Sequence, residues 1–343
     1  MPARTRFRLV MALVLPTAAL GAAEPTPAKA PDLPPMPKAV SSFGAVVCDG
    51  YLYVYGGHAG QTHSYDTESV LGTFQRLKLA GGTRWEELPG GPIAQGMNLV
   101  TRGGKVYRVG GMQPRNAPGE PSDNHSLADC ARFDPATKTW ETLPALPAGR
   151  SSHDVVVVGD KLVVVGGWQM KGKGEKSVWH DTALILDLGS AGAKWEAVPQ
   201  PFQRRALTAT AVGTKVYVLG GLGAEGKATD ILDAATRTWT TGPALPADGK
   251  KAMTFSPAAA TVNGRVVVNT VAGPVYRLTA DGQSWEKVGQ AATPRMVARL
   301  LPRDAATALL VGGARMGEGN TATVEVVRIA ETGTPVPPAA KME

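Results

Sequence analysis

The chain has 343 residues, of which 41 are Gly, 27 are Pro and only two are Cys. This composition excludes collagen, a coiled coil and a miniprotein built on disulfides, while the apolar fraction of 43% is enough to form a core. The formal net charge is +7, but no block of Lys and Arg is dense enough to indicate a nucleic-acid partner.

The first 23 residues have the pattern of a secretory signal peptide. Arg4, Arg6 and Arg8 precede an apolar run over residues 9–20, and three small residues end at Ala23. The run is too short to span a bilayer, so no membrane-spanning segment is expected. Cleavage after Ala23 would remove three Arg and no acid, which lowers the net charge from +7 to about +4. We therefore expect an exported protein, located in a periplasm or outside the cell.

An apolar run that ends in Gly-Gly recurs through the rest of the chain. Its copies end at Gly57, Gly111, Gly167, Gly221 and Gly313, and a degenerate copy ends at Gly273. Each of the first five copies is followed by one Trp at an equivalent position of the repeat: Trp85, Trp140, Trp195, Trp239 and Trp285. Trp168 and Trp179 lie outside this pattern. Successive copies are 40–56 residues apart, which is the length of a stacked structural repeat rather than of a whole domain.

Each copy predicts a four-stranded antiparallel meander. An apolar strand such as residues 154–158 ends at a tight turn that holds Gly, Asp or Asn, which two-residue hairpins require. The second strand ends in Gly-Gly, the third leads to a turn such as Phe133-Asp134-Pro135, and the fourth carries the Trp. One such sheet cannot bury both of its faces, so the copies must stack radially.

These features resemble the Kelch family of β-propellers. The Gly-Gly after an apolar strand, the aromatic-Asp-Pro turn and the Trp six residues after the Asp are the motifs that carry the resemblance, and they cover about residues 32–330. The resemblance implies an all-β, six-bladed propeller. Blade five departs from the pattern with Ala272-Gly273, and blade six has no Trp strand after residues 324–329.

The missing strand of blade six is expected at the other end of the chain. Residues 29–37 resemble residues 138–147, which hold the fourth strand of blade two. We therefore predict that blade six is closed by an N-terminal strand, which removes an open sheet edge. The predicted domains are a signal peptide at 1–23, a propeller at 24–331 and a disordered Pro-rich tail at 332–343.

One face of the propeller is the expected binding face. In a meander, the connections between strands two and three and between successive blades share a face, and the long connections 112–127 and 168–180 lie there. All five His fall on the same face. The candidate ligand-binding residues are Ser42, His58, His63, Gln95, Asn98, Arg115, Arg150, Ser152, His153, Trp168, Trp179, His180, Arg204, Arg205 and Arg295.

Several of these residues also have structural interpretations. His153 and Asp154 are interpreted as a hydrogen-bonded pair at a strand end or as part of the site. Arg204 and Arg205 are either exposed or in contact with a ligand. The two Cys, Cys48 and Cys130, lie in different repeats, so a buried free pair and a disulfide both stay open.

Three functions compete. The first is a ligand-binding module, monomeric and without a cofactor, whose partner is a protein or a glycan. The second is an enzyme, since the six-bladed bacterial N-acetylneuraminate epimerases (mutarotases) share the size, the blade count and the signal peptide. That resemblance implies an acid near an arginine, and Glu225 is the candidate acid, although the nearest basic residue in its loop is Lys227.

The third function is a metal site. The five His lack the short His-x-His or His-x-x-His spacing that favours chelation, so a site would have to be assembled across blades. Copper radical oxidases also use Kelch propellers, but they require a Cys–Tyr crosslink, and Cys48 belongs to an inner strand next to a turn on the opposite face. We therefore favour the binding module over either enzyme class.

Overall fold

The structure, a computed structural model, describes residues 33–223, 229–246 and 254–331. These residues form β-strands and connecting loops, and none of them is helical, so no membrane-spanning helix occurs in these ranges. The predicted signal peptide, the predicted tail, Glu225 and Lys227 lie outside the described residues.

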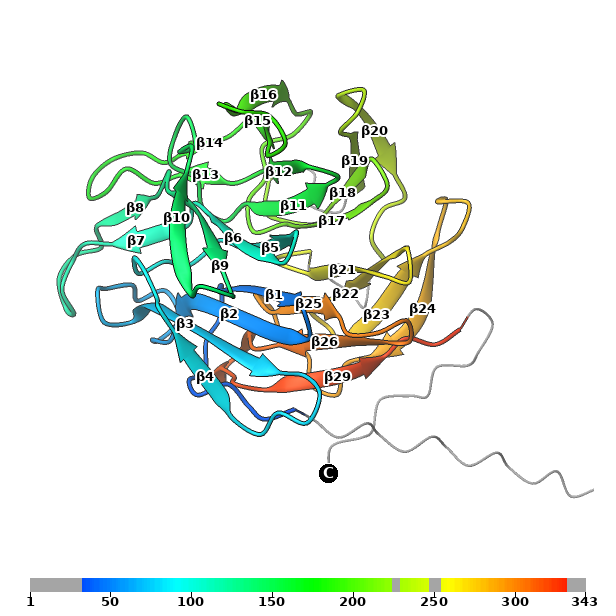
Figure 1. Cartoon of the computed structure of the whole chain (residues 1–343), viewed down its shortest axis with the longest axis horizontal. Helices are drawn as coiled ribbons and strands as arrows, with labels where there is room; N and C mark the ends of the chain where they lie inside the picture. The colour runs from blue at the N-terminus through cyan, green and yellow to red at the C-terminus, as the bar shows by residue number, and fades with distance from the viewer. Residues whose placement is uncertain (1–32, 224–228, 247–253, 332–343) are drawn as a thin grey trace, which may run out of the picture. The chain divides into compact units, whose positions relative to one another are not determined.

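Most of the described strands form six antiparallel sheets, which are the predicted blades, and the other six strands form three two-stranded hairpins (Figure 1). Blades one to three consist of β1 (Gly44–Cys48), β2 (Tyr51–His58), β3 (Val70–Lys78) and β4 (Trp85–Leu88); β5 (Leu99–Arg102), β6 (Lys105–Val109), β9 (Cys130–Asp134) and β10 (Thr139–Leu143); and β11 (Asp154–Val158), β12 (Lys161–Val165), β15 (Thr182–Asp187) and β16 (Glu196–Pro199). Blades four to six consist of β17 (Thr208–Val212), β18 (Lys215–Leu219), β19 (Thr229–Asp233) and β20 (Thr238–Gly242); β21 (Ala258–Val262), β22 (Arg265–Asn269), β23 (Pro274–Leu278) and β24 (Trp285–Gln290); and β25 (Arg299–Pro302), β26 (Thr307–Val311) and β29 (Val324–Arg328).

The blades close into a ring. The innermost strands contact one another in the order β1, β5, β11, β17, β21 and β25, and β25 contacts β1. The core lies between neighbouring blades, as where Val163 and Val165 of blade three pack with Val216 and Val218 of blade four. This radial stacking confirms the predicted six-bladed β-propeller, because each sheet buries its apolar faces against its neighbours.

The repeat Trp join the outer strands of successive blades. The indole N–H of Trp140 donates to the carbonyl of Pro89 at 2.7 Å, and that of Trp195 donates to the carbonyl of Pro144 at 2.8 Å. Trp239 and Trp285 make the same bond to Pro199 and Pro243. Each Trp therefore fixes its blade to the one before it.

The same bond shows how the N-terminal segment closes the ring. In blade one, the acceptor for Trp85 is the carbonyl of Pro34, at 3.3 Å. Leu33 pairs antiparallel with Val324, and the N–H of Met36 donates to the carbonyl of Ala322 at 2.8 Å. This segment therefore takes the place of a fourth strand in blade six. Its described part forms a single bridge, and residues 29–32 lie outside the described residues.

The Gly-Gly pairs let each second strand approach the start of the first strand. At Gly167, where φ is +89°, an added Cβ would lie 2.7 Å from the Cβ of His153 and 2.8 Å from the carbonyl oxygen of Ser151. A larger residue would push these segments apart, which explains the Gly that ends the strand.

Both Cys are free and buried. The hydroxyl of Thr101 donates to the sulfur of Cys48 at 3.0 Å. Burial raises the pKa of Cys130 to about 12, so this thiol is held in its neutral form. Of the two interpretations of these residues, a buried free pair and a disulfide, the structure shows the free pair.

Candidate functional site

The loops between second and third strands form a hydrogen-bonded wall on the predicted face. They include three short hairpins: β7 (Met112–Pro114) with β8 (Asn124–Ser126), β13 (Trp168–Gln169) with β14 (Val178–Trp179), and β27 (Ala314–Arg315) with β28 (Gly319–Asn320). Backbone pairing between His125 and Lys171 joins the hairpins of blades two and three. The Asn116 amide donates to the carbonyl of Tyr65, and the Asn320 amide donates to that of His58. Blades six, one, two and three therefore share one continuous rim.

Inside this rim, one residue of each blade adopts a left-handed conformation. The six residues are Ser42, Gly96, Ser152, Ala206, Ser256 and Val297, with φ between +47° and +63°. From Val297 through Ser42 to Ser256, each next residue donates its N–H to the carbonyl of the preceding one, at 2.6–3.1 Å. The six are on the loops that enter the innermost strands, so they encircle the central axis as a rigid frame.

A central cavity of about 320 Å³ lies on this frame. Its lining includes all six ring residues together with His63, Tyr65, Gln95, Trp168, Phe255, Arg205 and Arg299. Two of the lining residues are Arg and none, among those described, is Asp or Glu. The cavity is large enough for a small ligand, and its charge favours an anion.

Arg205 is the most exposed cation of the cavity and is held by two indole rings. Its guanidinium lies 4.0 Å from the ring centroid of Trp168 and 5.6 Å from that of Trp179. Its Nε and the indole Nε1 of Trp168 are buried and have no hydrogen-bond partner within the described part of the chain. Burial lowers the pKa of Arg205, and the nearby Tyr65 partly opposes this change. The two terminal nitrogens of Arg205, in contrast, are neither buried nor hydrogen-bonded in the described part of the chain, so they are the donors that acceptor oxygens of a ligand can reach from the cavity.

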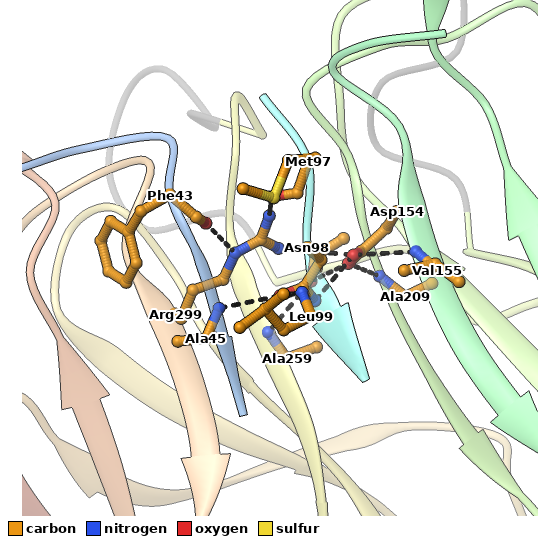
Figure 2. A network of polar contacts seen from close by, with 11 residues as sticks. Phe43, Ala45, Met97, Asn98, Leu99, Asp154, Val155, Ala209, Ala259 and Arg299 are labelled. Atoms are coloured by element: carbon orange, nitrogen blue, oxygen red, sulfur yellow. Dashed lines mark hydrogen bonds and ion pairs between the residues drawn. The ribbon is translucent and has the colours of Figure 1, made fainter. Parts of the chain in front are cut away.

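The floor of the cavity is a buried polar network (Figure 2). Arg299 donates from Nε to the carbonyl of Phe43 at 3.0 Å and from Nη2 to the carbonyl of Met97 at 2.5 Å, and its Nη1 lies 3.4 Å from Asp154. Asp154 also accepts from the amide of Asn98 at 2.9 Å and from the backbone of Ala209 at 2.8 Å. Burial lowers the pKa of Arg299, and Asp154 opposes this change. The network joins blades one, two, three, four and six.

Three predicted site arginines are instead buried beside the central cavity. Arg150 donates to the carbonyls of Gly166 at 3.2 Å and Thr182 at 2.8 Å. Arg204 donates to the carbonyl of Gly220 at 2.9 Å and forms an ion pair with Asp230. Arg295 pairs with the buried Glu325 at 2.8 Å. These side chains hold the strand ends of their own blades, and none of the three lines the central cavity.

The remaining predicted residues divide between the cavity and its surroundings. Ser42, His63, Gln95, Ser152, His153 and Trp168 line the central cavity, and Trp179 lines a neighbouring groove. His58 and His180 are committed to the carbonyls of Ser64 and Gly149, and Arg115 is exposed on the rim. Sequence reasoning missed Tyr65 and Arg299. Arg299 has a recognisable position in the repeat, because both it and Asp154 lie two residues after a left-handed ring residue.

His153 is almost fully buried, at the edge of the central cavity, and is uncharged at neutral pH. Its ring packs against Gly110 of blade two, where an added Cβ would lie 3.0 Å from Cε1. Burial lowers the pKa of His153 to about 3, and the charges of Arg150 and Arg299 act in the same direction. Its strand-end position beside Asp154 supports a structural role, although the two side chains do not pair, because Asp154 is bound by other groups.

This histidine predicts acid sensitivity. Because the unfolded chain binds a proton near pH 6.5 and the folded chain does not, stability should fall as pH drops below 6.5 and should be fully present above it. For His153 alone, with a folded pKa of about 3, the loss from pH 6.5 to pH 5 is about 2 kcal/mol. Urea unfolding at the two pH values should show a smaller loss in His153→Gln, while His125→Gln, at a partly exposed pair with Asp123, should leave the loss unchanged.

The fold and the cavity together define a six-bladed β-propeller with a ligand-sized central site. The Kelch motif model matches residues 39–70, so the chain carries a Kelch motif. The chain is 23% identical over 253 residues to Kelch-like protein terF of Aspergillus terreus (strain NIH 2624 / FGSC A1156), covering 71% of this chain and 53% of that protein. It is 33% identical over 113 residues to Kelch-like protein 7 of Rattus norvegicus, covering 33% of this chain and 18% of that protein. The chain thus spans about half of one relative and under a fifth of the other.

A solved structure shows the same architecture. The structure described as "Structure of YjhT" superposes with a TM-score of 0.68 at 16% identity, over 88% of this chain and 98% of that one. At this identity the likeness concerns the fold alone. Kelch propellers are commonly protein-interaction modules, which is the broad class that the motif and the fold support.

Proposed function

We propose that this chain is an exported, monomeric binding module whose central cavity takes a carboxylate group of a protein or glycan ligand. The observation that carries the proposal is Arg205, which is stacked on Trp168 and lines a cavity without a described acid. A guanidinium held flat presents a fixed pair of donors to a carboxylate. Export is supported by the signal-peptide pattern of residues 1–23.

The preorganised cavity supports binding rather than structure as the role of these groups. The terminal nitrogens of Arg205 are open to the cavity and have no partner in the described structure, so a ligand can satisfy them without breaking a bond within the protein. The adjacent rings fix the guanidinium, so little side-chain entropy is lost when a ligand binds. Arg299 adds positive charge below, although Asp154 partly neutralises it.

Binding of matched acids and esters tests the proposal. In isothermal titration calorimetry, glucuronate, N-acetylneuraminate or an N-acetylated tripeptide should bind more tightly than its own methyl ester. Arg205→Gln should weaken the binding of the acid by about 1.5–3 kcal/mol, or roughly tenfold to a hundredfold, because a charged hydrogen-bond donor is lost. Arg115→Gln, which changes an exposed arginine of the rim outside the cavity, is the control and should bind as the wild type does. Equal affinity for acid and ester would refute the carboxylate site.

A sugar epimerase of the N-acetylneuraminate type is the alternative proposal. An arginine that lines the central cavity supports it, because such a reaction needs the acid group of the sugar to be held. Tyr65 lines the cavity near Arg205, and burial raises the pKa of its hydroxyl, which keeps it a proton donor at neutral pH. If N-acetylneuraminate binds, proton NMR of its anomers with and without the protein would distinguish catalysis from binding.

A further inference from the structure

A second groove lies beside the central cavity, on the side of blades three and four. Its volume is about 700 Å³ and it is more open than the central cavity. Its lining is Trp179, Asp181, Gln200, Pro201, Phe202, Gln203, Arg204 and Gly223. The two spaces share no lining residue, but they meet at a pair of indole rings.

Trp168 and Trp179 form the wall between the two spaces. Trp168 lines the central cavity and Trp179 lines the groove, and their rings meet edge to face with centroids 6.0 Å apart. The guanidinium of Arg205 contacts both rings. A ligand group held by Arg205 is therefore one ring away from the groove.

Most polar groups of the groove are already used within the protein. Arg204 pairs with Asp230, and the Gln200 side chain accepts from the N–H of Gly166 and donates to the carbonyls of His180 and Phe202. The exposed side chains of Asp181 and Gln203, in contrast, have no hydrogen bond or ion pair with another described residue. The groove thus presents a carboxylate whose oxygens stay available.

The carboxylate of Asp181 does not form a hydrogen-bonded ion pair with the nearby Arg150. Arg150 is buried, and its guanidinium donates to Gly166 and Thr182 rather than to Asp181. The positive charge of Arg150 weakens the electrostatic attraction of Asp181 for a cation. The carboxylate oxygens of Asp181 nevertheless stay available as hydrogen-bond acceptors. On the other side of Trp179, Arg205 is a cation without a carboxylate partner in the described residues. The central cavity therefore offers a guanidinium without a carboxylate partner, and the groove offers a carboxylate without a hydrogen-bonded partner, among the described residues.

We infer that the groove is a second subsite, which binds an ammonium group of a ligand whose carboxylate lies at Arg205. This inference rests on the proposed function. An ammonium fits better than a neutral hydroxyl, because Asp181 supplies the opposite charge and the face of Trp179 supplies a cation–π contact. The ligand class is a zwitterion whose two charges are separated by the width of an indole ring.

A series of linear zwitterions measures this separation. The probes are the ω-amino acids from 4-aminobutanoate to 8-aminooctanoate, each compared with the unsubstituted alkanoate of the same carbon number by ligand-observed NMR titration of the full mature protein. At the matching chain length the amino acid should bind about threefold to tenfold more tightly than the alkanoate, as expected for one exposed ion pair and one cation–π contact. Asp181→Asn should remove this advantage and leave the alkanoate affinity unchanged.

The controls separate the two proposals. Glu87→Gln, which removes an exposed carboxylate from the outer strand of blade one, should keep the advantage. If alkanoates bind through Arg205 but the amino group adds nothing at any length, the second subsite is refuted and the carboxylate site stands. If Asp181→Asn weakens both series alike, Asp181 only supports the fold of the cavity and the inference fails. If neither series binds, the carboxylate site itself fails, and the second subsite fails with it.

Discussion

Asp154→Ala should lower the free energy of unfolding by about 3–5 kcal/mol, because it leaves the largely buried guanidinium of Arg299, whose side chain is 15% exposed, without its carboxylate. Asp154 is completely buried, and it accepts from Asn98, Thr208 and the backbone of Ala209 as well as from Arg299 (Figure 2). Its loss therefore affects four blades at once. Urea unfolding at pH 7 measures the change.

Two further variants distinguish charge from shape. Asp154→Asn keeps the size and some acceptors, so it should cost less than Asp154→Ala. The double variant Asp154→Leu with Arg299→Met removes both charges and should recover part of the loss, because replacing a whole buried pair by apolar groups is often tolerated. If Asp154→Ala unfolds at the same urea concentration as the wild type, the network does not stabilise the propeller.

The repeat pattern predicted most of the fold. Five copies of an apolar strand that ends in Gly-Gly and one degenerate copy were enough to place the blades, because the period of two in a strand and the need to bury both sheet faces leave few arrangements. The closure was also visible in the sequence. Leu33 and Pro34 match Leu143 and Pro144, and the carbonyls of both prolines accept from a repeat Trp.

The candidate site was predicted only in outline. Loop lengths indicated the face, and Ser42, Gln95, Ser152 and Arg205 of the candidate residues line the central cavity. The sequence did not show which of two adjacent residues points inward. Arg204 and Arg205 differ by one position, and this step turns one side chain into the blade and the other toward the cavity.

The parts of the site that the sequence did not predict depend on contacts between residues far apart in the chain. Arg299 meets Phe43, Met97 and Asp154, which are far away in sequence, so no local pattern predicts those contacts. Aligning the repeats on the left-handed ring residues would have placed Asn98, Asp154 and Arg299 at one level of the central axis. The loop residue Tyr65 has no such repeat position, and its place in the lining depends on the rim.

Arg204→Gln should also destabilise the protein, by about 3–5 kcal/mol, although a sequence alignment alone would treat it like its neighbour. The side chain is 0% exposed, pairs with the carboxylate of Asp230, donates to Gly220 and lies 4.1 Å from the ring centroid of Phe202. Glutamine cannot replace the charge that Asp230 faces. Urea unfolding should show the full loss, and a carboxylate probe should still bind the folded fraction at the central cavity.

Arg205→Gln is the matched control, since it makes the same chemical change one residue later. Its guanidinium has no carboxylate partner in the described structure, so removing it should change the unfolding free energy by about 1 kcal/mol, the contribution of a partly exposed cation–π contact. Arg204→Gln should therefore lose stability and keep binding, whereas Arg205→Gln should keep stability and lose binding. Equal destabilisation by both would mean that Arg205 holds the loops together, and the central cavity would lose its main argument for a ligand.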